Sequence, residues 1–326
     1  MKVLKSYLKT EMLDFLELRK STRSHSTFIH DCSVIYSFDE FLNKKNYSGK
    51  LFPEDFLAEY FSTLNGCSKT IADYVSKINC FLKYLEKMGY TVFISEIPKV
   101  KINYTPYIFS DEEIVEIFSN LDEMQFRKPY NEVMKFRMSM LVRILYATGI
   151  RVGEALNLQI KDIDFENGIL FIKEAKGYKQ RYVPMHITLT EMLEKYCFRM
   201  GIISDLEKYL FSVDGSNEPI MINRARYSFR KTVEKSSVNY HRGKWHERGP
   251  CMHCLRHCFV FHSFRKVEKE GMSINDAIPY LSIYLGHDSL NETDKYLEFN
   301  SEVFEEDMEK FSIFSMPLFP EVKNEE

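Results

Sequence analysis

The sequence predicts a mainly α-helical protein with a small β-hairpin, divided into two domains. A chain of 326 residues is long for one domain, and each part is large enough to bury a core of its own. Apolar residues recur at helical spacing over most of the chain. Two short strand-like segments, 169–172 and 181–183, flank a turn at Lys176-Gly177. We therefore expect a helical first domain at 1–105 and a mixed second domain at 108–326.

The first domain is expected to consist of helices that end at a linker. A loose apolar stripe covers 28–42, and a second one covers 56–64. The clearest helix runs over 70–88, where apolar residues are spaced by three and four, and Gly89 ends it. A stretch with two prolines and no helical period, at about 95–107, predicts the linker.

Capping signals and apolar runs define the elements of the second domain. Ser110 and Glu113 have the spacing of a capping box, and Thr188 and Glu191 repeat it before a helix that ends near Met200. The other predicted helices cover 131–147 (ended by Gly149), 154–158, 254–267 and 276–285, and a last short helix carries Tyr296.

The composition is that of an ordinary globular protein. Hydrophobic residues make up 44% and charged residues 28% of the chain. No apolar run approaches the ~20 residues of a membrane helix, and the first residues lack the apolar core of a signal peptide. Seven cysteines without regular spacing argue against a disulfide framework. We expect a cytoplasmic protein that does not enter a membrane.

The net charge of −3 hides an uneven distribution. Segment 301–326 holds eight acidic and two basic residues, a net charge of −6, so the other 300 residues carry +3. Eight basic residues fall within 222–248, and they are Arg224, Arg226, Arg230, Lys231, Lys235, Arg242, Lys244 and Arg248. In the first domain, Lys69, Lys77 and Lys83 lie mostly off the apolar stripe of the clearest helix. Such clusters fit contact with nucleic-acid phosphates, and solvated basic faces explain them equally well.

Several polar residues stand in an order that indicates chemistry on a phosphate. Arg151 follows a helix-ending glycine, and Glu154, three residues later, can hold its guanidinium on the same face of a helical turn. Lys176 lies in the predicted hairpin turn, and Lys179 and Arg181 are neighbouring cations. Each feature alone has an ordinary explanation, as a surface ion pair or as lysines that keep a turn soluble.

A second group of such residues lies downstream. His253, Arg256 and His257 are spaced to share one side of a helical turn, and arginine can fork onto two phosphate oxygens. His287 follows Leu285-Gly286, and Tyr296 comes nine residues later. Taken singly, Tyr296 is one of 20 tyrosines and fits an aromatic residue packed on a helix. In this order, however, the residues suggest a phosphate held by cations and attacked by a phenol.

A zinc site is the alternative interpretation of the same stretch. Cys251 and Cys254 form a C-x-x-C motif, and His253, His257 and Cys258 add further ligand types. No second cysteine pair lies nearby, and five ligands within eight residues are too crowded for one tetrahedral ion. The following apolar residues indicate a helix that enters a core, where cysteines pack as small hydrophobes. We expect no metal.

The motifs in order resemble the tyrosine recombinase (phage-integrase) family. They are Thr148-Gly149-Ile150-Arg151-Val152-Gly153-Glu154, then Ala175-Lys176-Gly177-Tyr178-Lys179-Gln180-Arg181-Tyr182-Val183-Pro184, then His253-Cys254-Leu255-Arg256-His257, Leu285-Gly286-His287 and Tyr296. The match covers the second domain from about Ser110 onward. Ala175 replaces the usual glycine before the hairpin lysine, and segment 278–284 resembles recombinases of transposon-like elements.

The resemblance implies an architecture and a set of catalytic roles. The first domain would be a SAM-like core-binding domain that clamps DNA, and the second a mixed α/β catalytic domain with a tail at 301–326. Arg151 and Arg256 would bind the scissile phosphate, and Tyr296 would attack it. Lys176 would be the general acid, and His253 would assist proton transfer. His287 would hydrogen-bond the phosphate, and Glu154 would support Arg151; no metal or cofactor would be needed.

The resemblance also implies partners. The protein would act on double-stranded DNA recombination sites, as a monomer or dimer off DNA and as a homo-tetramer on two sites. The apolar residues of the acidic tail, Val303, Phe304, Met308, Phe311 and Phe314, would pack on a neighbouring copy. Accessory DNA-bending or directionality proteins would set the outcome. The alternatives are a type IB topoisomerase-like enzyme, a catalytically inactive DNA-binding partner and a zinc-binding regulator.

Overall fold

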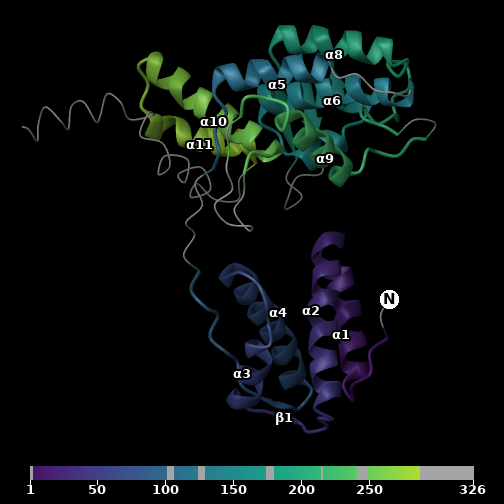
Figure 1. The fold of residues 1–326 in the computed structure, drawn as a ribbon, viewed down its shortest axis with the longest axis vertical. Coiled ribbons are helices and arrows are strands. Elements are labelled where there is room, and N and C mark those ends of the chain that lie inside the picture. The colour runs from purple at the N-terminus through teal and green to yellow at the C-terminus, as the bar shows by residue number, and fades with distance from the viewer. Residues whose placement is uncertain are drawn as a thin grey trace, which may run out of the picture. The chain divides into compact units, whose positions relative to one another are not determined.

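The computed structural model describes residues 3–100, 106–123, 129–173, 180–213, 216–238, 240 and 249–286. The chain separates into two compact units, Met1–Asn103 and Tyr104–Glu326. Helices dominate the described ranges, and the strands are few and short (Figure 1). The predicted fold class, mainly α with a small β element, is therefore confirmed. No helix within these ranges is long and apolar enough to cross a membrane.

The first unit is a helical bundle with one small parallel strand pair. Its elements are α1 (Lys9–Thr22), α2 (His25–Lys44), β1 (Leu51–Phe52), α3 (Glu54–Ser62), α4 (Ser68–Lys87) and β2 (Thr91–Val92). Their apolar faces share one core, in which Met12, Phe38 and Leu82 are buried. The helices predicted from the three apolar stripes are present as α2, α3 and α4, whereas α1 was not predicted as a separate element.

The second unit contains the longer run of elements. They are α5 (Asp111–Glu123), α6 (Pro129–Thr148), α7 (Val152–Leu156), the 3-10 turn η1 (Ile160–Asp162), β3 (Ile163–Asp164), β4 (Ile169–Ile172), β5 (Arg181–Pro184), α8 (Ile187–Arg199), α9 (Ile222–Val233), α10 (Met252–Lys269) and α11 (Ile274–Leu285). Helix α6 contacts α5, α8 and α10 and is the central helix of the core. The basic region around Arg226 is helical, as α9, which the sequence analysis did not predict.

The predicted hairpin is present within a three-stranded antiparallel sheet. β4 pairs with β3 on one side and β5 on the other. Leu170, Ile172 and Val183 are buried because alternate side chains of these strands face the core. The last register pair joins Ile172 to Arg181, so Arg181 begins β5 opposite the end of β4.

One of the two predicted capping boxes is confirmed and the other is wrong. Ser110 N–H donates to Glu113 Oε2 at 3.0 Å, and Glu113 N–H donates to Ser110 Oγ at 3.2 Å, ahead of α5. Helix α8, in contrast, begins at Ile187, before the predicted cap at Thr188. His186 caps it, because its Nδ1 accepts the Thr188 N–H at 3.4 Å. An imidazole in the N-cap position therefore starts the helix earlier than the threonine spacing suggested.

Candidate active site

The first part of the candidate site is the sharp connection between α6 and α7. Gly149 ends α6 with φ +64°, and a Cβ there would lie 2.5 Å from a ring carbon of Phe259 on α10. Both the left-handed backbone and this close approach require glycine. Arg151 follows as the N-cap residue of α7. The connection therefore directs the Arg151 side chain from a fixed backbone position.

Glu154 organises the charges around Arg151. Its carboxylate accepts the Arg151 N–H at 2.9 Å and Arg151 Nη1 at 3.0 Å. Arg181 forks onto the same carboxylate, with Nη1 to Oε1 at 3.1 Å and Nη2 to Oε2 at 2.7 Å. Burial raises the pKa of Glu154, but the hydrogen bonds and charges of Arg181 and Arg151 outweigh it and leave the pKa below its ordinary value. Glu154 is therefore a buried anion between two cations.

Arg181, which the sequence offered as a DNA-contact candidate, makes internal contacts with described residues. Besides the fork onto Glu154, its Nε donates to the Tyr284 carbonyl oxygen at 2.8 Å. Arg181 thus connects strand β5, Glu154 and the last turn of α11. No sequence motif signals this role, because the carbonyl partner lies 103 residues away in the chain.

Arg256 lies in the core of the site, with only 2% of its surface exposed. Its Nη1 donates to the Gly149 carbonyl oxygen at 2.8 Å, and its Nη2 donates to the Leu285 carbonyl oxygen at 2.9 Å. A neutral carbonyl oxygen orients a guanidinium without cancelling its charge. Arg256 therefore holds the ends of α6 and α11 together while it remains a cation.

Arg151 reaches the same end of α11. Its Nη2 donates to the Gly286 carbonyl oxygen at 3.1 Å, so the two arginines bind the carbonyls of consecutive residues. Gly286 ends α11 with φ +64°, and a Cβ there would lie 3.1 Å from Arg181 Nη1. The predicted arginines thus converge beside the residue that precedes His287 in the chain.

The two histidines of the His-x-x-Arg-His stretch differ in environment. His253 is exposed, whereas His257 is 7% exposed, and their rings meet edge to face with centroids 4.7 Å apart. Burial and the nearby His253 and Arg256 lower the pKa of His257 to about 3. His257 is therefore neutral near pH 7, and His253 is the more accessible of the two.

Tyr284 joins the site from the last turn of α11. Its hydroxyl donates to the Thr148 carbonyl oxygen at 3.0 Å, and its ring stacks on Phe259 with centroids 5.4 Å apart. Burial raises the pKa of Tyr284, so the hydroxyl stays a neutral donor. This tyrosine fixes α11 against α6, and no sequence motif marks it as a site residue.

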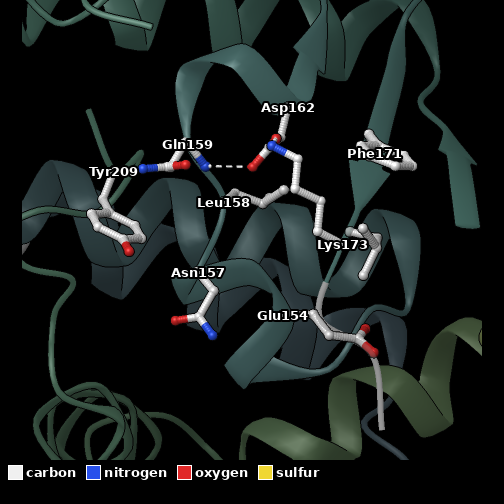
Figure 2. Close-up of a pocket in the computed structure, with 9 residues that line it drawn as sticks. Glu154, Asn157, Leu158, Gln159, Asp162, Phe171, Lys173 and Tyr209 are labelled. Atoms are coloured by element: carbon white, nitrogen blue, oxygen red, sulfur yellow. Dashed lines mark hydrogen bonds and ion pairs between the residues drawn. The ribbon is translucent and has the colours of Figure 1, made fainter. Parts of the chain in front are cut away.

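A small cavity lies beside Glu154 and is lined by the end of strand β4 (Figure 2). Its volume is about 130 Å³. Lys173, directly after β4, extends across it to an ion pair with the buried Asp162, whose Oδ2 also accepts the Gln159 N–H at 3.1 Å. The Glu154 carboxylate is turned away from Asp162 in this view. The Asp162–Lys173 pair therefore fixes the chain directly after β4, three residues before Lys176 in the sequence.

Four predicted site residues, Lys176, Lys179, His287 and Tyr296, lie outside the described residues. Of the other DNA-binding candidates, Lys69, Lys83, Arg226 and Arg230 are exposed and Arg224 is half-buried. Arg230 Nε lies 3.6 Å from Oε1 of Glu234, four residues later in the chain. Lys77 is different, because its Nζ pairs with the buried Asp31 at 2.5 Å. This ion pair joins α4 to α2 within the first unit.

The cysteine cluster sits at the start of α10. Cys254 and Cys258 are buried, and Cys251 is half-buried, with its sulfur 3.7 Å from that of Cys254. Across the described parts of the chain, no three His, Cys, Asp or Glu side chains are grouped as metal ligands would be. The zinc alternative thus gains no support from these residues.

The sequence is related to known recombinases. It is 29% identical over 210 residues to y4rB of Sinorhizobium fredii, a protein named as an integrase/recombinase, and this match covers 63% of the chain and 65% of that relative. It is 25% identical over 302 residues to the tyrosine recombinase XerC of Staphylococcus aureus, which covers 89% of the chain and 91% of XerC.

Solved structures share the fold. The XerH site-specific recombinase, bound to palindromic difH substrate in a post-cleavage complex, has a TM-score of 0.69 at 21% identity and covers 89% of this chain and 80% of its own. A lambda integrase tetramer bound to a Holliday junction has a TM-score of 0.62 at 15% identity, with 86% and 77% coverage.

A model of the phage integrase family matches residues 108–302. This range is more than half of the chain, and it includes every residue of the candidate site from Arg151 to Tyr296. The chain therefore belongs to the phage integrase family of tyrosine recombinases.

Proposed function

We propose that this protein is a site-specific DNA recombinase that cleaves and rejoins strands through a 3′-phosphotyrosyl intermediate. The observation that carries the proposal is the convergence of Arg151 and Arg256 on the carbonyls of Leu285 and Gly286. Two cations are thereby held at one point, directly before His287 and ten residues before Tyr296. Simple DNA binding would not require two guanidinium groups fixed in this way next to a potential nucleophile.

The two arginines would stabilise the charge that grows on the phosphate oxygens. Arg151 uses Nη1 for Glu154 and Nη2 for Gly286 among the described residues, and a guanidinium has five N–H donors. Fixed donors in a site sheltered from water stabilise developing charge better than mobile ones, because no reorganisation is needed during the reaction. Glu154 and the carbonyl partners supply that fixed arrangement.

The covalent step would be an attack by Tyr296 on phosphorus. The phenol oxygen forms a bond to phosphorus and loses its proton, while the bond to the 5′ oxygen breaks and that oxygen takes up a proton. Lys176 would donate this proton, His253 would assist proton transfer, and His287 would hydrogen-bond the phosphate. Attack by a 5′-hydroxyl of another strand reverses these steps and releases Tyr296, so rejoining needs no external energy source.

DNA recombination sites and further copies of the chain are the partners that fit this chemistry. Related solved proteins are named as complexes with a recombination substrate and, as a tetramer, with a Holliday junction. We extend this to the present chain as a homo-tetramer on two double-stranded sites. In the second unit, α9 presents the exposed Arg226 and Arg230 as phosphate contacts. The exposed Lys69 and Lys83 of the first unit would do the same.

An apolar groove offers a place for contact between copies. It has a volume of about 480 Å³ and lies between α10 and α11, which pack against each other in Figure 1. Its apolar lining includes Phe259, Phe264, Met272, Tyr280, Leu281 and Tyr284. We assign it to the apolar residues of segment 301–326 from a neighbouring copy, because a tetramer needs a contact of this kind between protomers.

The test is the formation of a covalent protein–DNA adduct on a denaturing gel. Nicked duplexes tiled across the DNA flanking the gene trap the intermediate, because the short strand released by cleavage diffuses away. The wild-type protein should form an adduct that maps to Tyr296. Tyr296→Phe should form none while binding the same duplexes with unchanged affinity, since only the attacking oxygen is removed.

Two outcomes contradict the proposal. An adduct that persists in Tyr296→Phe means that another residue is the nucleophile. Specific binding of a duplex without any adduct from the wild-type protein supports a catalytically inactive DNA-binding partner instead.

A further inference from the structure

The start of α10 carries two thiols in contact. Cys251 is the N-cap residue, in an extended conformation with φ −151° and ψ 170°, and Cys254 lies in the first helical turn. Their sulfur atoms are 3.7 Å apart. Cys251 is half-buried and open to a small reagent, whereas Cys254 is fully buried beneath it. The Cys251 sulfur is therefore accessible to a small solute, and the Cys254 sulfur lies next to it but is shielded from solvent.

The helix makes the two sulfurs chemically unequal. The N-terminus of the 18-residue α10 carries partial positive charge, which favours a thiolate on its N-cap residue. The hydrogen bond with Cys251 and burial raise the pKa of Cys254, so this sulfur keeps its proton. Cys251 is thus the attacking sulfur and Cys254 the resolving thiol, as in C-x-x-C pairs at helix starts.

We propose that Cys251 and Cys254 form a reversible disulfide on exposure to a peroxide and that this disulfide slows DNA cleavage. The Cys251 thiolate attacks a peroxide oxygen, the O–O bond breaks, and a sulfenic acid and hydroxide form. The Cys254 sulfur then attacks the sulfenic sulfur, the S–S bond forms, and the S–O bond breaks. Its proton leaves with that oxygen as water. Two thiols lose two electrons, and hydrogen peroxide becomes two molecules of water.

The geometry selects this pair over the other cysteines. The sulfurs need to approach by only about 1.7 Å to reach the S–S bond length. Cys258 is buried and engaged elsewhere, since its sulfur accepts the Phe109 N–H at 3.2 Å. Cys67 and Cys80 are exposed but belong to the first unit. Both are replaced by serine in the test protein, so that their oxidation does not compete with that of the pair.

The disulfide would affect the candidate site because it closes a ring that includes a proposed catalytic residue. The ring closed by Cys251 and Cys254 contains His253, the proposed proton-transfer residue. The ring of His253 contacts that of His257, and Arg256 follows within the same turn. Drawing the sulfurs together reshapes this first turn, so the orientation of His253 changes while the DNA-facing surfaces elsewhere do not. This effect on cleavage rests on the proposed function.

The chemical part of the test does not depend on recombinase activity. The double variant Cys67→Ser/Cys80→Ser is treated with hydrogen peroxide, alkylated, and digested with trypsin. Residues 249–256 form one tryptic peptide that contains both cysteines of the pair and no other. The expected product is this peptide two hydrogen atoms lighter and unalkylated, and it should return to the dialkylated form after dithiothreitol. Full alkylation of both sulfurs after peroxide overturns the proposal.

The functional part compares oxidised and reduced protein on a nicked duplex. Oxidation should slow adduct formation at least about tenfold at unchanged DNA affinity, because a misplaced proton-transfer group typically costs more than that. Dithiothreitol should restore the rate. Cys251→Ser in the same background should cleave as the reduced parent does and should not respond to peroxide.

Two results would separate the parts of the inference. A mapped disulfide with an unchanged cleavage rate overturns the control of cleavage. Absence of cleavage by the fully reduced protein contradicts the proposed function, and the peptide mapping still decides whether the disulfide forms.

Discussion

At the scale of single residues, the site is built from one carboxylate and a few backbone carbonyls. Glu154 binds both Arg151 and Arg181, and the carbonyls of Gly149, Leu285 and Gly286 bind Arg151 or Arg256. A buried carboxylate is stable only when cations and hydrogen bonds compensate the loss of water. Removing one cation therefore disturbs the position of the other through Glu154.

Arg181→Lys tests this coupling. Lysine keeps the positive charge but cannot fork onto the two carboxylate oxygens. We expect adduct formation to slow by about ten- to a hundredfold, with DNA affinity nearly unchanged, because Arg151 loses its fixed orientation. On a duplex whose scissile phosphate is replaced by a neutral methylphosphonate, Arg181→Lys should reduce the rate of adduct formation by a smaller factor, since less charge then needs to be stabilised.

A matched control separates this effect from general loss of packing. Arg143 forks onto Asp122 in the same unit, and in the described contacts this pair shares no partner with Arg151, Arg181 or Arg256. Arg143→Lys should leave the cleavage rate on both duplexes unchanged. An equal loss for Arg181→Lys on charged and neutral phosphates would mean that Arg181 does not act through Arg151.

The sequence predicted the charged residues of the site and the Arg151–Glu154 pair, but not the other partners of these residues. Arg151, Glu154 and Arg256 stand in motifs with fixed spacing, and the predicted Arg151–Glu154 pair is present. Backbone carbonyls have no residue-specific signal, and Arg181 looked like any other basic residue of a turn. Contacts between residues more than a hundred positions apart become visible only in the folded chain.

At the scale of helices and strands, apolar periodicity predicted the elements with one buried face. Helix α4 is the clearest example, with Val75, Ile78 and Leu82 on its buried side. Helix α1 escaped prediction because apolar residues lie on both faces, with Met12 buried and Leu13 exposed. The basic helix α9 escaped because only Ala225, Phe229 and Val233 of its twelve residues are buried apolar residues of the core.

Charge pairing also joins the helices of the first unit. Asp31 on α2 is 2% exposed and accepts hydrogen bonds from Arg19 of α1 at 2.6 Å and from Lys77 of α4 at 2.5 Å. Burial raises the pKa of Asp31, but the two cationic partners outweigh it and hold the pKa below its ordinary value. One carboxylate therefore connects three helices.

Asp31→Asn should destabilise the first unit by roughly 3 kcal/mol, because it leaves two mostly buried cations without their counter-charge. Chemical denaturation monitored by circular dichroism measures the free energy of unfolding. Since the pKa of Asp31 is lower in the folded state, the difference from wild type should be full above about pH 4 and should vanish as the pH falls through the folded pKa.

Glu40→Gln is the control on the same helix. Glu40 pairs with Lys44 at the surface, with both side chains largely exposed, and such pairs contribute little. Its effect on the free energy of unfolding should be much smaller than that of Asp31→Asn. Comparable losses for the two variants would rule out a special role for the buried cluster.

At the scale of the whole molecule, the proposed roles in catalysis and DNA contact are distributed over the two units. The second unit holds every described residue of the candidate site, and each unit encloses its own core. The first unit contributes a helical bundle with exposed lysines. In the sequence, the expected division rests on the proline-containing linker, where a stretch without helical period interrupts the apolar pattern.

Assembly of several copies is the property that we propose for the whole molecule. In the Tyr296→Phe background, which prevents cleavage, truncation before Ser301 should leave binding to a single site intact. It should abolish the slower-migrating complexes formed with two sites. The apolar residues of segment 301–326 would otherwise fill the groove between α10 and α11 of a neighbouring copy.

The groove side of this contact can be tested with one matched pair of variants. Tyr280 lines the groove and is 77% exposed, and Phe198 on α8 lies outside the groove lining and is 78% exposed. Tyr280→Asp should prevent assembly as truncation does, because it places a charge where an apolar segment would bind. Phe198→Asp should assemble normally, which shows that loss of an exposed aromatic ring alone has no effect. If the truncated protein forms the same complexes as the full chain, segment 301–326 does not carry the contact between copies.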